Sequence, residues 1–436
     1  MSSEKNIQFK VQPGGRLNGR LRVPGDKSIS HRAIMLGSLA EGVTHVSGFL
    51  EGEDALATLK AFRAMGVQIE GPDNGRVVIH GVGMHGLRAP ESALDLGNSG
   101  TSIRLMAGLL AGQGFDVEMV GDASLSKRPM RRVTEPLALM GAHIDTAEGG
   151  MPPLHVRADS RLKGINYALP MASAQVKSCI LLAGLYAEGE TSVTEPAPTR
   201  DHTERMLQGF SYEVRRDAAT ARLTGGGSLQ ATDIDVPSDI SSAAFFMVGA
   251  TIAVDSDVTL EHVGVNPTRT GVIDILRLMG AQIDVSNQRE VGGEPVADIR
   301  IRSSQLKGIH IPDALVPLAI DEFPALFIAA ACAEGETVLT GAEELRVKES
   351  DRIQVMADGL LKMGIKAEPT PDGIVIQGGS MQGAEVDSHG DHRIAMSFAM
   401  AALRAQGIVI INDCANVNTS FPNFVTLASG AGLGIK

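Results

Sequence analysis

Apolar residues along this chain recur at helical spacing, in stretches that alternate with short strand-like segments. Residues 351–363 show this most clearly: Ile353, Met356, Leu360 and Met363 lie three or four positions apart and form one apolar stripe. A glycine follows many such stretches, and glycine readily takes the left-handed conformation that ends a helix. The pattern therefore predicts helices that alternate with short strands.

The pattern repeats at a spacing of roughly 70 residues, which indicates a chain built from similar units. Each unit consists of a helix, a glycine turn, a strand, a loop, a second helix, a glycine and a second strand. A Met-Gly phrase, in which the glycine ends the second helix, occurs at Met65–Ile69, Met140–Ile144, Met279–Ile283 and Met363–Ala367, with weaker copies at Gly209–Tyr212 and Ala431–Ile435. An Ala-Glu-Gly phrase after the first helix occurs at residues 40–44, 187–191 and 333–337.

Six units divide into three plus three, so we expect an α/β (α+β) fold of two similar lobes. The alternative is a single solenoid, but the loops between strand and helix differ too much in charge for a uniform array. Short polar segments with proline, at Leu21–Pro24 and Val236–Asp239, interrupt the pattern and mark the crossovers. Lobe 1 then comprises residues 1–20 and 240–436, lobe 2 comprises residues 21–239, and a ligand cleft lies between them.

Length, charge and cysteine content limit the class of protein. With 436 residues, the chain exceeds the size at which one core usually stops growing. Its 51 Asp and Glu against 39 Lys and Arg give a net charge of -12, which argues against nucleic-acid binding but not against small anions. Cys179, Cys332 and Cys414 are odd in number and widely separated, which favours reduced thiols in the cytoplasm. Residues 1–12 lack the apolar segment of a signal peptide, and no stretch reaches membrane-spanning length.

Cations stand where the predicted strands lead into helices. In Gly25–Arg32, the Lys27 and Arg32 side chains, the Ser28 hydroxyl and the free amides of a helix start would converge on an anion. The segment is not a Walker A loop, because Asp26 separates Gly25 from Lys27. The alternative is an ordinary helix cap beside a solvated lysine.

Similar segments occur farther along the chain, each with helix capping or a solvated charged face as the alternative. They are Leu96–Arg104, Lys127–Arg132 with four cations in six residues, Met171–Lys177 and Thr199–Glu204. Five units place a cation at this corner: Lys27, Arg104, Arg200, Lys348 with Arg352, and Arg393. So many like charges at helix starts are costly unless anions bind there, so the joint pattern favours an anion-binding cleft.

Carboxylates occur among these cations. Asp321 and Glu322 stand at an apolar helix start, where nearby positive charge would keep a general base ionised. Residues 344–352 alternate in charge, and a salt-bridged helix entry is the alternative there. Asp387, His389, Asp391 and His392 match no standard metal-site spacing, so we expect no metal.

At these segments the sequence closely resembles the 5-enolpyruvylshikimate-3-phosphate (EPSP) synthase family, from about Leu17 to the C-terminus. The resemblance implies two lobes of three repeated units, of the inside-out α/β barrel type, and neither metal nor organic cofactor. It also implies transfer of the enolpyruvyl (carboxyvinyl) group of phosphoenolpyruvate to the 5-hydroxyl of shikimate 3-phosphate, through a tetrahedral intermediate, in aromatic amino-acid biosynthesis. The matching motifs are Gly25–Arg32, Leu96–Thr101, Arg128–Met130, Ser173–Lys177, Asp321–Glu322 and Asp391–Arg393.

The resemblance implies a role for each site residue. Asp321 resembles the base that takes the 5-hydroxyl proton, and Glu349 the acid that protonates the methylene carbon; Lys27 and His392 complete the catalytic set. The shikimate 3-phosphate contacts would be Lys27, Ser28, Arg32, Ser173, Ala174, Gln175, Arg200, Asp321 and Lys348. The phosphoenolpyruvate contacts would be Lys27, Gly100, Arg128, Gln175, Arg352 and Arg393.

The sequence departs from the family pattern at one segment and leaves the herbicide response open. Residues 418–422 lack the Lys that many members carry before Thr-Phe-Pro, which leaves one phosphate contact in doubt. Ser173–Lys177, Arg200–Glu204 and Asn266–Arg269 resemble the class II subgroup, often tolerant of glyphosate, whereas Gly100 is typical of sensitive members.

Two alternative functions follow from the same fold. One is enolpyruvyl transfer to UDP-N-acetylglucosamine, whose family places a Cys in the loop corresponding to residues 121–132, where this chain has none. The other is a sensor of phosphorylated metabolites that needs no base. The partners we expect are the two small substrates, with no nucleic acid or membrane, and the chain as a monomer.

Overall fold

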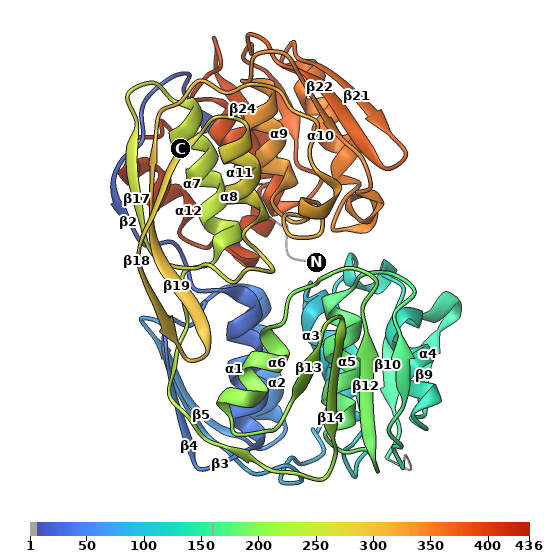
Figure 1. Cartoon of the computed structure of the whole chain (residues 1–436). Coiled ribbons are helices and arrows are strands. Elements are labelled where there is room, and N and C mark those ends of the chain that lie inside the picture. The colour runs from blue at the N-terminus through green and yellow to red at the C-terminus, as the bar shows by residue number, and fades with distance from the viewer. Residues whose placement is uncertain (1–6, 159–160) are drawn as a thin grey trace. The chain divides into compact units, whose positions relative to one another are not determined.

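The computed structural model describes residues 7–158 and 161–436 and divides the chain into two compact units (Figure 1). Unit 1 comprises the residues up to Pro24 together with Pro237–Arg289 and Pro295–Lys436. Unit 2 comprises Gly25–Val236 and Glu290–Glu294.

Unit 2 contains three copies of one arrangement: a strand, a buried helix, a strand, an amphipathic helix and two further strands. Its helices are α1 (Lys27–Leu39), α2 (Glu53–Ala64), α3 (Gly100–Leu110), α4 (Arg131–Leu139), α5 (Ala174–Gly184) and α6 (His202–Gly209). Its strands are β3 (Ala40–Glu41), β4 (Val43–Ser47), β5 (Gln68–Asp73), β6 (Arg76–His80), β7 (Leu94–Asp95), β8 (Val117–Val120), β9 (Ile144–Ala147), β10 (Met151–Val156), β11 (Asn166–Ala168), β12 (Glu190–Thr194), β13 (Arg215–Asp217), β14 (Thr220–Thr224), β15 (Leu229–Gln230) and β16 (Ile234–Asp235).

The three main sheets of unit 2 have the same topology. Their strand orders are β16-β4-β6-β5, β7-β8-β10-β9 and β11-β12-β14-β13. In each sheet the first two strands pair in parallel and the remaining pairs are antiparallel. The sheets therefore confirm a threefold repeat, and they add two strands to each repeat that the sequence pattern did not predict: a parallel edge strand and an antiparallel strand.

Unit 1 repeats the same arrangement. Its helices are α7 (Ile240–Ile252), α8 (Gly271–Leu278), α9 (Phe323–Ala331), α10 (Arg352–Lys362), α11 (His392–Ala401) and α12 (Phe424–Ala431). Its strands are β1 (Phe9–Val11), β2 (Asn18–Leu21), β17 (Asp257–Gly264), β18 (Gln282–Val291), β19 (Glu294–Arg302), β20 (Glu336–Leu339), β21 (Lys366–Thr370), β22 (Gly373–Gln377), β23 (Glu385–Asp387) and β24 (Val409–Asn412), where the tip of the β18–β19 hairpin belongs to unit 2. The sheets have the orders β18-β19-β17-β2, β20-β22-β21 and β1-β24-β23. The α/β fold of two similar lobes, each of three repeats, is confirmed.

At both crossovers of the chain, a strand and the helix that directly follows it belong to different units. Strand β2 directly precedes α1 in the chain but pairs with β17 of unit 1, whereas β16 directly precedes α7 but pairs with β4 of unit 2. Strand β1 completes the last repeat by pairing antiparallel with β24. Both units are thus closed by strands that are distant in sequence.

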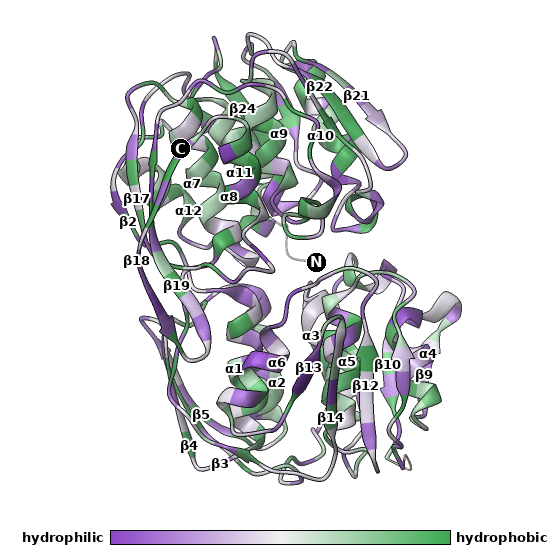
Figure 2. Ribbon diagram, viewed as in Figure 1, coloured by the Kyte–Doolittle hydropathy of each residue, from purple (hydrophilic) through white to green (hydrophobic). Residues whose placement is uncertain are grey.

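The first helix of every repeat is buried on all sides. All residues of α7 and α9 are buried, and α1 is buried from Ile29 to Leu39. These inner helices contact one another and the strands of their own sheets, so helices fill the centre of each unit. Much of α9 and α11 is green in Figure 2, as expected for helices without a solvent face. The second helices, such as α10, instead bury only one stripe.

The glycines of the Met-Gly phrase end their helices as predicted, with one exception. Gly66, Gly141, Gly280 and Gly364 have φ of 89°, 97°, 104° and 82°, and Gly432 has 118°. In the weak copy at Gly209–Tyr212, however, Gly209 is the last residue of α6, and Ser211 takes the left-handed conformation with φ of 64°. The prediction for Gly209 was wrong because the helix continues past the position that the repeat assigns to its end.

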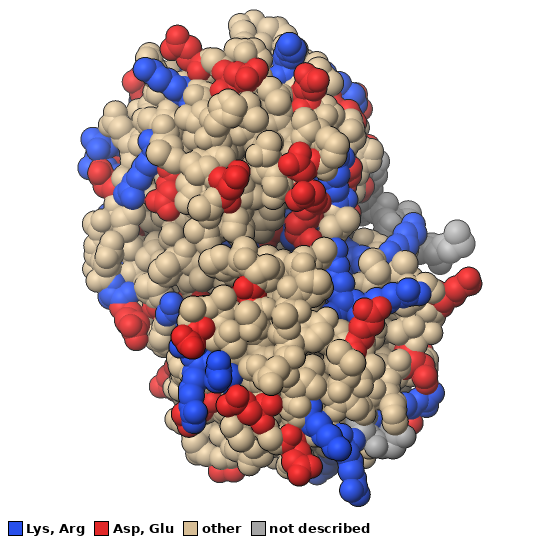
Figure 3. All heavy atoms as spheres, turned by 45° about the vertical axis from the view of Figure 1, so that its right-hand side comes forward, with Lys and Arg blue, Asp and Glu red and all other residues tan. Residues whose placement is uncertain are grey.

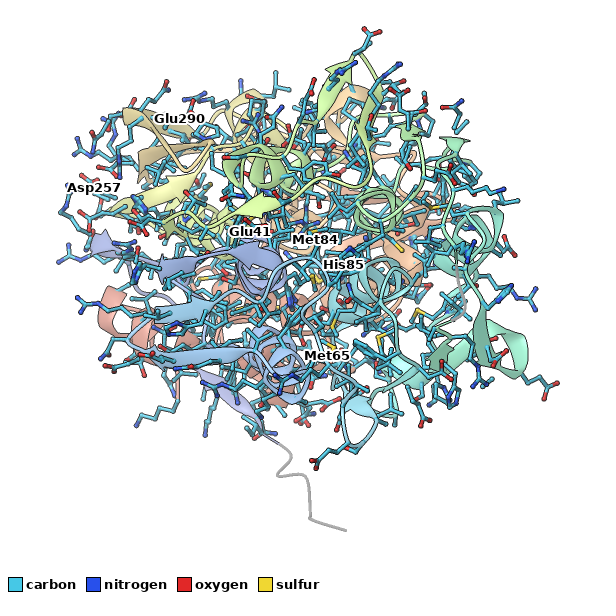
Figure 4. The ribbon with its side chains drawn as sticks, turned by 90° about the horizontal axis from the view of Figure 1, so that it is seen from below. Glu41, Met65, Met84, His85, Asp257 and Glu290 are labelled. Carbon is cyan, nitrogen blue, oxygen red and sulfur yellow. The ribbon has the colours of Figure 1, made fainter. Side chains whose placement is uncertain are left out.

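The inner helices of unit 2 approach closely at glycines. A Cβ atom on Gly108 of α3 would lie 2.1 Å from the carbonyl oxygen of Cys179 on α5. Beyond the C-terminal end of these helices, the Tyr186 hydroxyl donates to the Met84 carbonyl (3.0 Å), and the ring of His85 lies edge-on to Tyr186. Figure 4 views this end of unit 2 and labels Met84 and His85. In the part of the chain that the structure describes, no helix is both long and apolar enough to cross a membrane.

Replacing Gly108 with Ala should separate α3 from α5, because the new Cβ cannot occupy a position 2.1 Å from a backbone oxygen. We expect Gly108→Ala to lower the free energy of unfolding by about 1–3 kcal/mol, measured by urea denaturation. Gly114→Ala is the matched control, since its Cβ would meet nothing within 4 Å. Equal stability of the two variants would show that the close approach does not stabilise the unit.

Candidate active site

The start of α1 brings together the first predicted anion-binding residues. Asp26 caps the helix by accepting a hydrogen bond from the Ile29 amide (2.9 Å). Lys27 and Ser28 occupy the first turn, and the Lys27 ammonium lies 2.9 Å from Oδ2 of Asp54 on α2. The capping role therefore belongs to Asp26, which leaves Lys27 and Ser28 at the open end of the helix.

Arg32, one turn farther along α1, is 4% exposed and its position is fixed by hydrogen bonds. Its guanidinium donates to Oγ1 of Thr203 (2.7 Å), to Oγ of Ser178 (2.9 Å) and to the Ser28 carbonyl (2.9 Å). Burial, with a smaller contribution from the positive charge of Arg200, lowers the pKa of Arg32 to about 10 against the opposing charges of Glu204 and Asp26. Arg32 therefore stays protonated at neutral pH.

The starts of α3 and α5 are joined by side chains. Ser99 caps α3 and Ser173 caps α5 by accepting from backbone amides. Arg104 donates to Oε1 of Gln175 (2.6 Å), and Nε2 of Gln175 donates to the Thr101 hydroxyl (3.2 Å). Together with the Arg32–Ser178 bond, these contacts place the first turns of α1, α3 and α5 at one end of unit 2, with Ser173, Ala174 and Gln175 among them.

Gly100 lies beside two guanidiniums. A Cβ atom there would be 3.0 Å from Nη1 of Arg128 and 3.2 Å from Nη1 of Arg104. Arg128 also donates to Oδ1 of Asn98 (2.9 Å). The lack of a side chain at position 100 therefore lets both cations approach the start of α3.

The run of four cations at Lys127–Arg132 does not form one patch. Arg128 faces Asn98 and Gly100, but Lys127 and Arg131 are exposed, and Arg131 packs against Gly150. On the face drawn in Figure 3, positive and negative side chains are interspersed rather than separated into a broad basic surface.

In unit 1, three carboxylates surround the buried guanidinium of Arg352. Its Nε lies 2.8 Å from Oδ2 of Asp391, its Nη2 2.6 Å from Oε2 of Glu349 and its Nη1 3.3 Å from Oδ1 of Asp321. Burial by itself would lower the pKa of Arg352, but the three negative charges outweigh it and raise the pKa above its ordinary value. Conversely, burial raises the pKa of Asp391, and the Arg352 charge outweighs that effect and lowers it.

Lys348 and Arg393 lie beside Asp321 as well. The Lys348 ammonium is 3.7 Å from Oδ1 of Asp321, and Nη1 of Arg393 donates to the backbone carbonyl of Asp321 (2.9 Å). His392 is the first residue of α11 and is buried. The structure thus gathers the predicted residues of this half: Asp321, Lys348, Glu349, Arg352, His392 and Arg393.

Sequence reasoning missed the partners that hold this group in place. Asp391 is fully buried, caps α11 through the Arg393 amide (3.0 Å) and pairs with Arg352. Arg269 donates to Oδ1 of Asp239 (3.0 Å) and to Oγ of Ser241 (2.7 Å). A helix-capping Asp next to cations is the only signal in the sequence that could have indicated these roles.

Other charged residues of the same region are structural. Arg346 forms an ion pair with Oδ2 of Asp351 at 2.6 Å. The alternative interpretation of residues 344–352, a helix start stabilised by salt bridges, is therefore correct for Arg346. Two residues before the segment that lacks the family lysine, Asn416 donates to the carbonyl of Gly390 (2.6 Å), next to Asp391. Among the described residues, no group of three His, Cys, Asp or Glu side chains is arranged to hold a metal ion.

Comparison with known proteins agrees with this geometry. A family model described as EPSP synthase (3-phosphoshikimate 1-carboxyvinyltransferase) matches residues 11–427. The chain belongs to the EPSP synthase family. The resemblance inferred from the motifs, and the enzyme class that it implied, are therefore confirmed.

Relatives in the EPSP synthase family match over nearly their whole length. A protein named 3-phosphoshikimate 1-carboxyvinyltransferase from Methylococcus capsulatus is 70% identical over 99% of each chain, and one from Nitrosococcus oceani is 69% identical over 100% of this chain and 98% of its own. A solved structure of EPSP synthase from Acinetobacter baumannii is 65% identical, covers 98% of this chain and 99% of its own, and superposes with a TM-score of 0.90. These matches favour the EPSP synthase function over the UDP-N-acetylglucosamine and sensor alternatives.

The buried His31 makes the stability of the protein depend on pH. Its Nδ1 lies 2.8 Å from the Thr58 hydroxyl, and burial, followed by the positive charges of Lys27 and Arg32, lowers its pKa well below 6.5. The unfolded chain therefore binds a proton that the folded chain does not. Above the pKa that His31 has in the unfolded chain, its burial does not make stability depend on pH. As the pH falls below that value, proton binding to the unfolded chain lowers the free energy of unfolding.

We expect the free energy of unfolding to fall as the pH decreases from about 7 to about 5, with His31 contributing at most about 1.4 kcal/mol per pH unit. Denaturation of His31→Asn at several pH values should give a shallower slope than the unsubstituted chain. His45→Asn, at an exposed position, is the control and should leave the slope unchanged. An equal slope in His31→Asn would contradict a neutral buried His31.

Proposed function

We propose that both units supply residues to one enolpyruvyl transfer from phosphoenolpyruvate to the 5-hydroxyl of shikimate 3-phosphate, which releases phosphate. The observation that supports this best is the set of three carboxylates and three cations around Asp321 and Arg352 in unit 1. Unit 2 adds cations and helix starts that suit phosphate groups. The reaction belongs to aromatic amino-acid biosynthesis.

Unit 2 provides most of the proposed contacts to shikimate 3-phosphate. Thr203 and Ser178 hold the guanidinium of Arg32 in place. Its remaining N–H groups can therefore donate to a ligand with little further loss of side-chain entropy. The first turn of α5 offers hydroxyl, amide and backbone groups that suit ring hydroxyls. The proposed set is Lys27, Ser28, Arg32, Ser173, Ala174, Gln175 and Arg200, with Asp321 and Lys348 from unit 1.

Phosphoenolpyruvate needs cations for both its carboxylate and its phosphate. Arginine binds such groups by forked, charge-assisted hydrogen bonds, and Arg128, Arg352 and Arg393 are suited to this task. Lys27 and Gln175 complete the contacts, and Gly100 leaves room for the ligand beside Arg128.

The chemistry requires one proton to leave the acceptor hydroxyl and one to reach the methylene carbon. We assign the first transfer to Asp321, whose carboxylate lies between Lys348 and Arg352 and is favoured in its ionised form. Glu349 donates the second proton while the hydroxyl oxygen bonds to the neighbouring enol carbon. Loss of that proton back to Glu349 and loss of phosphate then restore the double bond in the product.

Lys27 and His392 complete the proposed catalytic set. Lys27 stands at the open end of α1, where its charge offsets that of the phosphate as it leaves. His392 is the buried first residue of α11, between Asp391 and Arg393. These steps are proton transfers and charge stabilisation by side chains, so we propose that no cofactor takes part.

We also propose a cytoplasmic monomer. The free thiols of Cys179, Cys332 and Cys414 support the compartment, and burial raises the pKa of each to about 12, so they are unreactive.

Replacing the proposed base should abolish turnover without abolishing binding. We expect Asp321→Ala to lower kcat by about 10²–10⁴-fold, the contribution typical of a general base, while shikimate 3-phosphate still binds. The measurement is phosphate release with both substrates, with each substrate omitted in turn, together with binding by calorimetry. Asp358→Asn, on the exposed side of α10, should keep full activity.

Unchanged turnover of Asp321→Ala would show that the base lies elsewhere. Phosphate release from phosphoenolpyruvate alone, at the rate seen with both substrates, would contradict the transfer itself. The sensor alternative predicts that the chain releases no phosphate with any combination of substrates and that Asp321 and Glu349 are dispensable.

Adding one methyl group at Gly100 should displace Arg128 and Arg104 by a few tenths of an ångström. We expect Gly100→Ala to raise the KM for phosphoenolpyruvate by about tenfold, because the displaced guanidinium of Arg128 no longer has the geometry for forked hydrogen bonds to the substrate. Gly114→Ala, in open space, is the control for the added methyl group. A KM equal to that of the control would remove Arg128 and Gly100 from the phosphoenolpyruvate site.

A further inference from the structure

A buried ion cluster lies behind the shikimate 3-phosphate residues of unit 2. The Lys177 side chain on α5 is 0% exposed, and its ammonium lies 3.1 Å from Oε1 of Glu195 and 2.8 Å from Oε1 of Glu204. Both carboxylates are buried too. A buried ammonium is stable only with close negative partners, so the positions of these three side chains are strongly constrained. None of the roles proposed above involves them.

Glu195 connects the cluster to the loop that bears Arg200. The loop follows β12, and the hydroxyl of Thr199 donates a hydrogen bond to Oε1 of Glu195. Thr199 is buried and directly precedes Arg200. Because Lys177 holds Glu195, it also holds the loop from residue 195 to residue 200.

Glu204 connects the cluster to Arg32. It lies on the first turn of α6, next to Thr203, whose hydroxyl accepts from Nε of Arg32 (2.7 Å) and donates to Ser178 (2.8 Å). Ser178 follows Lys177 on α5 and accepts from Nη2 of Arg32 (2.9 Å). The pairing of Lys177 with Glu204 therefore fixes α6 against α5 at the point where both contact Arg32.

We propose that Lys177 is a positioning residue for shikimate 3-phosphate: through Glu195 and Glu204 it sets the places of Arg200 and Arg32. It contacts no substrate and acts through these two arginines. The inference rests on the proposed function, which assigns Arg32, Arg200 and the start of α5 to this substrate. Supporting side chains of this kind matter because a small displacement of a binding group costs much of its effect.

The test uses a double substitution, Lys177→Met with Glu204→Gln, which removes one positive and one negative charge and so keeps the net charge of the cluster. Steady-state phosphate release is measured with each substrate varied in turn. We expect the KM for shikimate 3-phosphate to rise about tenfold or more, because its phosphate contacts are no longer aligned. The KM for phosphoenolpyruvate should change by less than about twofold, since the residues assigned to this substrate alone have no contact with the cluster. These residues are Gly100, Arg128, Arg352 and Arg393.

Two variants separate this role from its alternatives. Leu182→Ala lies on the same helix, is 1% exposed and creates a cavity, so it lowers stability while the KM for shikimate 3-phosphate stays unchanged. Arg200→Ala tests the proposed function itself and should raise that KM. If the double variant does not fold, Thr199→Val decides instead: it keeps the ion cluster and side-chain volume, removes only the hydroxyl, and should raise the same KM about threefold.

Each outcome has one meaning. An unchanged KM in the double variant, or in Thr199→Val where the double variant is unfolded, would overturn the role of Lys177 if Arg200→Ala raises the KM. An equal rise in Leu182→Ala would also overturn it, because the effect would then be a general loss of stability. An unchanged KM in Arg200→Ala would instead show that Arg200 does not bind shikimate 3-phosphate. The proposed role of Lys177 in positioning Arg200 would then be wrong as well.

Discussion

The nearly complete burial of the first helix in each repeat is the constraint on which the rest of this structure depends. Such a helix leaves backbone N–H groups at its start that need partners, and it cannot obtain them from solvent along its sides. Side chains supply them at five of the six inner helices: Asp26, Ser99, Ser173, Asp239 and Asp391 each accept from a backbone amide. Proposed site residues follow four of these caps, namely Lys27, Gly100, Ala174 and, one position farther on, Arg393, whereas Asp239 is followed by the apolar Ile240. The packing of the core therefore determines where the anion-binding groups stand, and the positive ends of the helix dipoles add to their charge.

Buried charge is the second consequence, because cations that stand in or beside the starts of these buried helices lose much of their hydration. The protein compensates each with carboxylates at short range: Asp391, Glu349 and Asp321 around Arg352, and Glu195 and Glu204 around Lys177. Such pairs contribute little net stability, since desolvation offsets most of the attraction. Their effect is geometric: each fixes a guanidinium or ammonium that would otherwise adopt many rotamers. The ion networks are thus better understood as supports for binding groups than as a source of stability.

The repeats and their boundaries could be predicted from sequence because they depend on local signals. Helical spacing, the Met-Gly phrase and the glycines at positive φ are all properties of a few consecutive residues. The pairing partners of β2 and β16 could not, because each strand pairs with one more than 180 residues away. Resemblance to a family supplied the site residues and their roles, but not the supports of those residues. Asp391 and Lys177 stand in motifs of the family, but they act through contacts with distant segments, which the local sequence does not show.

Asp321 and Glu322 show how the same constraint separates two adjacent carboxylates. Both precede α9, the one inner helix without a side-chain cap. Glu322 is 3% exposed and accepts a hydrogen bond from the Ser241 hydroxyl. It lies 3.9 Å from both Arg269 and Arg393, so its negative charge is balanced by buried cations. Asp321 is more exposed, at 15% of its side chain, and faces Lys348 and Arg352. A general base needs nearby positive charge and access to its substrate, and of these two carboxylates only Asp321 combines facing cations with partial exposure. The environment of each carboxylate, rather than its chemistry, thus makes Asp321 the candidate base and Glu322 a support for Arg393.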